Sequence, residues 1–160
     1  MPTVLIVYDS RTGNTEKAAK LVVDGVKEVE GVDCILKRVD DVSLEDLLNS
    51  DGIIIGSPTY YGSMSAKIKN LLDESVKIHG RLEGKVGAAF TSSGGTASGA
   101  ETTILSILEA FLIHGMIIQG DPHSQHYGLA VVGAPDAKEA DLCRKFGARI
   151  ARLVYKILKR

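Results

Sequence analysis

The chain has 160 residues, of which 44% are hydrophobic and 24% charged, and its formal net charge is -1 at pH 7. This length and composition predict a single globular domain, residues 1–160, with a full core. No apolar run is long enough to span a membrane, and a predicted strand follows directly after Met1-Pro2, so we expect neither membrane insertion nor a signal peptide.

The two cysteines, Cys34 and Cys143, lie far apart and lack CxxC spacing, so we expect reduced thiols in a cytoplasmic protein. Eight of the 19 Lys and Arg residues lie between Lys138 and Arg160. They are interleaved with the apolar stripe of a predicted helix, which favours a solvated helix face over a nucleic-acid surface. We therefore expect no nucleic-acid partner.

Short apolar runs alternate with segments of helical periodicity, which is typical of βαβ units around a parallel sheet. In chain order, the strands are expected at Thr3–Tyr8, Asp33–Val39, Gly52–Ser57, Val86–Thr91 and from Met116, with a further short apolar run at Leu129–Val132. The helices are expected at about Asn14–Val29, Leu44–Leu48, Ser65–Val76, Glu101–His114 and Asp136–Leu158. In the third helix, periodicity predicts inward positions for Ile68, Leu71, Leu72 and Val76.

The first strand runs into a short polar turn, Tyr8–Thr15, that opens the first helix. Free N–H groups at the start of a helix, together with the helix dipole, attract an anion. Ser10, Thr12 and Thr15 can add hydroxyl donors, and Gly13 accepts a positive φ without steric cost. The turn therefore favours a phosphate cradle, and the alternative is a plain turn with a Ser or Asn helix cap and no ligand.

Two further loops follow strands three and four, at the edge of the sheet where ligands bind in such folds. The loop Ser57–Ser65 contains Pro58, which ends the strand, two tyrosines suited to a flat ring, and Gly62, which permits close approach of the backbone. The loop Thr91–Thr102 is rich in glycine and hydroxyls, which suits a polar ligand. Either loop alone is also compatible with an ordinary surface loop; together with the cradle they favour a ligand site.

In detail, these residues resemble known flavin proteins. The turn after strand one resembles the phosphate loop of the flavodoxins, Thr/Ser-x-Thr-Gly-x-Thr. Later segments resemble the tryptophan-repressor-binding-protein (WrbA) type of NAD(P)H:quinone oxidoreductase, an FMN-binding family with the flavodoxin fold that commonly forms tetramers. These segments are Ser57-Pro58-Thr59, Gly62, Met64-Ser65-Ala66, Gly84-Lys85-Val86-Gly87, Phe90-Thr91-Ser92, Glu101-Thr102-Thr103 and His114-Gly115-Met116.

The resemblance implies an α/β, three-layer flavodoxin-like fold, with a five-stranded parallel sheet of order 2-1-3-4-5 and helices on both faces. It also implies bound FMN, and FAD is not expected because no second dinucleotide turn is present. The implied phosphate contacts are Ser10, Arg11, Thr12, Gly13, Asn14 and Thr15. The implied contacts to the ring and ribityl chain are Pro58, Thr59, Tyr60, Tyr61, Gly62, Ser92, Ser93, Gly94, Gly95, Thr96 and Ser98, with His114 beside the flavin. Tyr8 matches a position assigned to the nicotinamide nucleotide.

The histidines leave alternatives open. His114 can contact the flavin, or it can complement the C-terminus of the fourth helix. His123 and His126 suggest a metal site only weakly, because spacing fixes no third strong ligand, so no metal is expected. Their loop can lie near the flavin edge or can be a plain surface loop.

Two functions remain open at this point. One is an electron carrier that exchanges electrons with partner proteins through FMN, and the other is an enzyme that passes electrons from NAD(P)H to a quinone. The chain contains no Trp and lacks a helical insertion that is usual in WrbA-type proteins, which favours the carrier, although a pI of about 6.4 fits the strongly acidic flavodoxins poorly. A phospho-receiver module is rejected because Ser57-Pro58 stands where it needs an Asp. A ligand-free scaffold is a further alternative.

Two more expectations concern surfaces and motion. The fourth helix is apolar on more than one face, which predicts a homo-oligomer, a dimer or a tetramer. The resemblance to flavodoxins also implies that a peptide adjoining Gly62 rotates when the flavin is reduced, since glycine accepts backbone angles that other residues do not.

Overall fold

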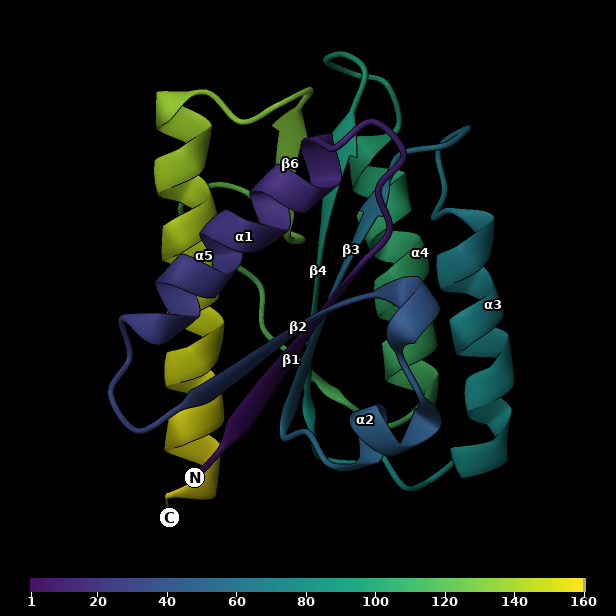
Figure 1. Ribbon diagram of the computed structural model, residues 1–160, viewed down its shortest axis with the longest axis vertical. Coiled ribbons are helices and arrows are strands. Elements are labelled where there is room, and N and C mark those ends of the chain that lie inside the picture. Colours follow the sequence, from purple (N-terminus) through teal and green to yellow (C-terminus); the bar gives the residue numbers. More distant parts are fainter. Residues whose placement is uncertain (160) are drawn as a thin grey trace.

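A computed structural model describes residues 1–159, and it contains a parallel sheet at the centre of the molecule (Figure 1). The strands are β1 (Thr3–Tyr8), β2 (Asp33–Arg38), β3 (Gly52–Pro58), β4 (Val86–Ser93), β5 (Ile117–Ile118) and β6 (Leu129–Val132). Their order is β2-β1-β3-β4-β5, with β6 also paired to β4. All of these pairs are parallel, so the carboxyl ends of β1, β3 and β4 meet at one edge, the upper one in Figure 1.

Helices cover both faces of the sheet, which gives three layers (Figure 1). The helices are α1 (Asn14–Lys27), α2 (Leu44–Leu48), α3 (Ala66–Glu74), α4 (Ala100–Ile113) and α5 (Ala137–Leu158), with short 3₁₀ turns η1 (Val39–Asp41) and η2 (Ser75–Ile78). Alternate strand residues point to opposite faces. In β1, Val4 and Ile6 pack with α1 and α5, whereas Leu5 and Val7 pack with α3 and α4. The predicted flavodoxin-like architecture is confirmed.

The predicted fifth strand differs from the observed one. It is divided into β5, which pairs with the start of β4 at Val86–Gly87, and β6, which pairs with its end at Phe90–Ser93. Residues 119–128 leave the sheet between the two pieces. The sheet therefore has six strands, and the short apolar run Leu129–Val132 continues the edge that β5 begins.

The prediction that Val76 faces inward is wrong. The α-helix ends at Glu74 and the chain tightens into the 3₁₀ turn η2, with three residues per turn. This change of period moves the inward position to Ile78, which is 6% exposed, while Val76 is 70% exposed. A periodic pattern in the sequence does not show where an α-helix changes to a 3₁₀ turn.

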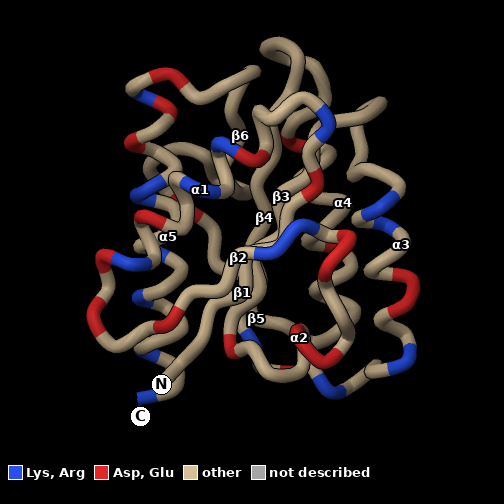
Figure 2. Tube along the Cα trace, in the orientation of Figure 1, with Lys and Arg blue, Asp and Glu red and all other residues tan. Residues whose placement is uncertain are grey.

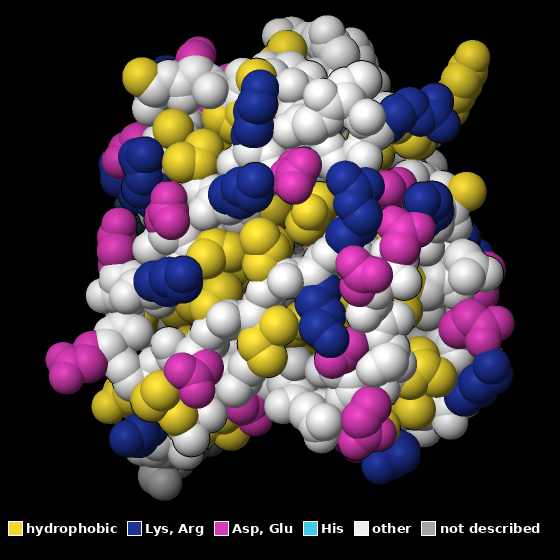
Figure 3. All heavy atoms as spheres, viewed as in Figure 1, with side chains coloured by type: hydrophobic (Ala, Val, Ile, Leu, Met, Phe, Trp, Pro, Cys, Tyr) yellow, Lys and Arg dark blue, Asp and Glu magenta, His cyan; other side chains and the backbone are white. Residues whose placement is uncertain are grey.

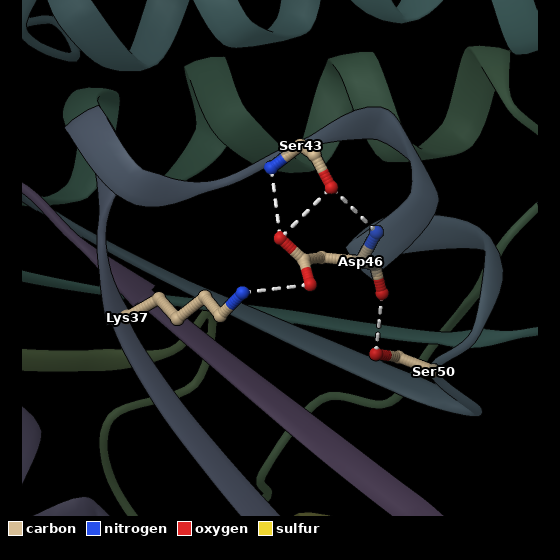
Figure 4. Close-up of polar contacts among 4 residues, drawn as sticks. All are labelled: Lys37, Ser43, Asp46 and Ser50. Carbon is tan, nitrogen blue, oxygen red and sulfur yellow. Dashed lines mark hydrogen bonds and ion pairs between the residues drawn. The ribbon is translucent and has the colours of Figure 1, made fainter.

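The short helix α2 is held by a capping network at its start (Figure 4). The Ser43 hydroxyl accepts from the Asp46 N–H at 3.2 Å, and the Asp46 carboxylate accepts from the Ser43 N–H at 2.8 Å. The same carboxylate accepts from Lys37 Nζ at 2.8 Å, which ties α2 to β2. Burial alone would raise the pKa of Asp46, but the hydrogen bonds from Lys37 and Ser43 outweigh it and lower that pKa.

Charged residues lie mainly on the helices and loops rather than on the central strands (Figure 2). On the face seen in Figure 3, basic and acidic side chains are interspersed with apolar ones, so that face carries no extended field of a single sign. Within residues 1–159 no helix is both long enough and apolar enough to cross a bilayer.

Candidate functional site

The turn between β1 and α1 is shaped by Ser10. Its buried hydroxyl accepts from the N–H of Gly13 at 3.1 Å and from the N–H of Glu16 at 3.3 Å. Gly13 is the N-cap residue of α1 in the left-handed region, at φ 96°, and supplies no side-chain cap. Within residues 1–159, the N–H groups of Asn14 and Thr15 donate to no other group. A helix start with unpaired donors binds an anion.

The space around this turn fits a phosphate. A Cβ built on Gly13 would meet no atom within 4 Å, so the glycine is needed for its φ and leaves open room above the helix start. Thr15 is 2% exposed at the base of the turn, while Arg11 and Thr12 are exposed at its rim. The positive end of the α1 dipole lies at the same place. These features match the predicted phosphate cradle.

The loop after β3 forms a tight hairpin that carries the two tyrosines. Tyr60 and Ser63 exchange both backbone hydrogen bonds, each 3.1 Å long. The two residues between them, Tyr61 and Gly62, have positive φ values of 50° and 74°, as in a type I′ turn. Tyr61 is fully exposed at the tip, and the Arg11 guanidinium lies 5.2 Å from the centroid of the Tyr60 ring.

Contacts between loops fix this hairpin against the next loop. The N–H of Thr59 donates to the carbonyl of Ser92 at 3.0 Å, and the hydroxyls of Thr59 and Thr91 lie 2.7 Å apart. Gly99, the N-cap residue of α4, has a φ of 95°, and a Cβ placed on it would lie 2.7 Å from the Cα of Gly62. The two loops therefore touch through backbone atoms, and Gly99 must remain a glycine for that contact.

The loop after β4 begins buried and becomes exposed. The Ser92 hydroxyl donates to the carbonyl of Gly133 at 2.8 Å, and the Ser93 hydroxyl donates to the carbonyl of Gly95 at 2.9 Å. Both serines therefore use their protons inside the protein. The exposed residues of this loop are Gly94, Thr96, Ala97 and Ser98. This loop and the hairpin lie at the same edge of the sheet (Figure 1).

The structure brings these three loops together, but it does not bring His114 to them. His114 follows the last residue of α4, whose first residue adjoins Gly99. A helix of 14 residues is about 21 Å long, so His114 lies at the opposite edge of the sheet. Within one chain His114 thus lies away from the three loops, because α4 runs away from them, and its contact with the flavin stays a prediction.

The other two segments considered near the ligand are Tyr8 and the loop with His123 and His126. Tyr8 is 7% exposed, its hydroxyl donates to Glu16 at 3.1 Å, and burial raises its pKa. Its ring therefore belongs to the core under α1 rather than to a nucleotide surface. The loop with His123 and His126 packs on α5 through Arg149, which donates to the carbonyl of Gly120 at 3.3 Å. Within residues 1–159 no three His, Cys, Asp or Glu side chains could hold a metal ion.

Sequence reasoning missed Arg38 and Lys67, which border a cavity of about 270 Å³ beside the phosphate turn. Arg38 donates to the carbonyl of Ser10 at 2.9 Å, and Lys67 pairs with Asp40 at 2.7 Å. Arg38 ends β2, the neighbour of β1. Ligands bind at the carboxyl ends of the strands in such folds, so the rule that pointed to the loops after strands one, three and four also applies to Arg38. Lys67 lies in the first turn of α3 and carried no signal of its own.

An anion cradle after the first strand, and two touching loops after the third and fourth, define a flavodoxin-like FMN redox protein. The family model described as NADPH-dependent FMN reductase matches residues 2–125, and the chain belongs to that family. Family membership implies that the chain binds FMN, and the open helix start and the room above Gly13 fit its phosphate.

Curated relatives carry two kinds of name. A flavodoxin of Aquifex aeolicus is 40% identical over 162 residues, with 96% of this chain and 88% of that protein covered. A flavodoxin of Clostridium saccharobutylicum is 36% identical over 160 residues, covering 96% and 98%. An NAD(P)H dehydrogenase (quinone) of Archaeoglobus fulgidus is 34% identical over 191 residues, covering 98% and 100%.

Solved structures agree with this assignment of the fold. A flavodoxin, WrbA-like protein from Agrobacterium tumefaciens superposes with a TM-score of 0.84 at 23% identity, covering 98% of this chain and 99% of that one. A flavodoxin from the domain Archaea superposes with a TM-score of 0.79 at 28% identity, covering 96% and 99%.

Proposed function

We propose that this protein is an electron carrier that exchanges electrons with partner proteins through FMN. When bound, FMN supplies the redox chemistry, and the chain supplies binding, orientation and access. The N–H groups of Asn14 and Thr15 and the hydroxyls of Thr12 and Thr15 hold the phosphate. Ser10 shapes the turn with its oxygen lone pairs and keeps its own proton for the ligand. Residues of Pro58–Gly62 and Ser92–Ser98 would hold the ring.

The observation that carries this proposal is the length of the chain, compared with that of its flavodoxin relatives and of its quinone dehydrogenase relative. The alignment with the quinone dehydrogenase spans 191 positions, so at least 31 of them have no residue in this chain of 160. The alignments with the two flavodoxins span 162 and 160 positions and leave far fewer positions without a residue of this chain. The chain thus lacks extra segments of the quinone dehydrogenase, as expected for a carrier.

The shape of the site supports the same conclusion. The tip residue Tyr61 and most of the loop at Gly94–Ser98 face solvent. Open loops suit contact with a protein surface.

A pair of anaerobic assays on the FMN-loaded protein tests the proposal. Chemically reduced protein should pass electrons rapidly to a one-electron acceptor protein such as cytochrome c. With NADH or NADPH and benzoquinone, quinone reduction should not exceed the rate given by free FMN at the same concentration. Turnover with either nucleotide near about 10 s⁻¹, a typical enzyme value, would refute the carrier assignment.

The second candidate is an NAD(P)H:quinone oxidoreductase. The relative from Archaeoglobus fulgidus supports it, because that protein is matched over its whole length at 34% identity. In this reading the redox partners are NAD(P)H and a quinone. The nicotinamide–quinone assay above separates the two candidates directly.

We further propose that the protein forms a homo-oligomer, a dimer or a tetramer, and works in the cytoplasm. Leu112 and Ile113, at the end of α4, are 60% and 74% exposed, which leaves an apolar surface for a second copy. Cys34 and Cys143 are free thiols, and burial raises their pKa values to about 11 and about 12. Unreactive free thiols are in keeping with a reducing compartment.

A further inference from the structure

A buried histidine at the edge of the sheet opposite to the FMN loops has a fixed hydrogen-bonding state. The Ser75 hydroxyl in η2 donates its only proton to the carbonyl of Leu72. The same oxygen lies 2.7 Å from Nε2 of His114, so it accepts, and Nε2 must carry the hydrogen. In neutral His114, Nδ1 is therefore an unprotonated nitrogen with a free lone pair.

That lone pair has no partner within residues 1–159. His114 is 7% exposed, and its Nδ1 is a buried polar atom without a hydrogen bond. Leaving such an atom unpaired is unfavourable.

A second imidazole stands next to it. The ring of His79, at the end of η2, is exposed, and its centroid lies 5.7 Å from that of His114, with the planes tilted by 40°. With metal–nitrogen bonds of about 2.0–2.1 Å, two imidazoles on one tetrahedral ion have centroids roughly 5–6 Å apart. Both histidines line a cleft of about 370 Å³ between α3–η2 and α4; the His79 ring is exposed, whereas His114 Nδ1 itself has almost no exposed area.

We propose that His79 and His114 form a binding site for Zn²⁺ or a similar late transition-metal ion. Ser75 acts as the outer partner that holds the His114 ring, since metal-binding histidines regularly donate their other N–H to a neighbouring oxygen. No third His, Cys, Asp or Glu among residues 1–159 completes the set, so water fills the remaining positions. The ion joins η2 to the end of α4 and stabilises the folded protein.

The experiment uses the untagged, FMN-loaded full chain, titrated with Zn²⁺ by calorimetry and followed by thermal unfolding. We expect one zinc per chain, a raised Tm, and no binding of Mg²⁺, which prefers oxygen ligands. His79→Ala removes an exposed ligand without disturbing the core and should weaken zinc binding at least tenfold. Ser75→Ala removes the oxygen that holds the hydrogen on His114 Nε2 and should weaken zinc binding several-fold.

The chain has four histidines, and the other two provide a matched control. His123→Ala/His126→Ala should bind zinc as the wild type does. ¹⁵N spectra should show that zinc moves the His114 Nδ1 resonance and leaves those of His123 and His126 in place. Zinc binding that survives His79→Ala but is lost in the double variant would overturn the proposal. The absence of binding at 1 mM Zn²⁺, or an unmoved Nδ1 resonance, would overturn it as well.

Discussion

The hairpin tip offers a test of how the protein controls the first reduction of its FMN. Rotating the peptide between Tyr61 and Gly62 converts a type I′ turn into type II′. Tyr61 already has a φ of 50°, and after rotation it would need an extended ψ as well, a region open essentially only to glycine. The cost is about 1–3 kcal/mol. A new hydrogen bond to the reduced flavin returns only about 0.5–1.5 kcal/mol. We therefore expect the peptide to stay in place in the wild type, contrary to the rotation implied by the resemblance to flavodoxins.

Replacing Tyr61 by glycine removes that barrier. In Tyr61→Gly the rotated peptide can stabilise the reduced form by about 0.5–1.5 kcal/mol. This should raise the midpoint potential for the first electron by roughly 20–65 mV, since 1.4 kcal/mol equals about 59 mV for one electron.

The control is Tyr61→Asn, which also lacks the ring and accepts a positive φ but not the rotated conformation. Both variants are compared by spectroelectrochemical titration. Equal potentials in the glycine and asparagine variants would refute this reasoning, because the turn would then not limit the rotation.

Four further outcomes are expected. Thr15→Ala should weaken FMN binding by roughly ten- to a hundredfold, because it loses a hydrogen bond to a charged group that is worth about 1.5–3 kcal/mol. An unchanged affinity in a fluorescence titration would show that the backbone N–H groups suffice. Asp46→Ala should lower the free energy of unfolding by about 1 kcal/mol and Tm by about 2–4 °C, because α2 loses its reciprocal cap; an unaltered melting curve would contradict this. Acidification from pH 7 to 5 should destabilise the wild type more than His114→Gln. The pKa of His114 is lowered in the native protein, so over this range the unfolded chain takes up a proton that the native chain does not; His79, Lys69, Asp73 and Glu109 line the same cleft. Equal pH slopes of the free energy of unfolding in urea would count against this prediction. Ile113→Lys should reduce self-association in sedimentation at micromolar concentration, and a wild type that is already monomeric would remove the oligomer proposal.

The strands and the turn after β1 could be predicted from the sequence because they depend on local patterns, whereas the sheet order came from the resemblance to flavodoxins. The run Thr3–Tyr8 is continuously apolar, and a polar turn with Gly13 follows it, so strand, turn and helix each have their own signal. The division of the last strand into β5 and β6 had no comparable signal, since either piece is too short to show a period. Contacts between distant loops, such as Gly99 against Gly62, depend on tertiary packing and could not be read from spacing.

His114 shows that a residue can match a family motif in sequence without lying beside the predicted ligand loops of its own chain. His114-Gly115-Met116 resembles its family counterpart residue by residue, yet the length of α4 decides where the imidazole lies. The same helix links the two proposed sites: its N-cap residue Gly99 touches the FMN hairpin, and its C-cap residue His114, one of the two proposed zinc ligands, lies about 21 Å away. Substitutions more than about 10 Å apart usually have independent effects. His79→Ala should therefore leave FMN affinity unchanged, and Thr15→Ala should leave zinc affinity unchanged. If His79→Ala changed FMN affinity and Thr15→Ala changed zinc affinity, α4 would have to move as a rigid element that couples the two sites. The loss of affinity at either site could then not be assigned to local contacts alone.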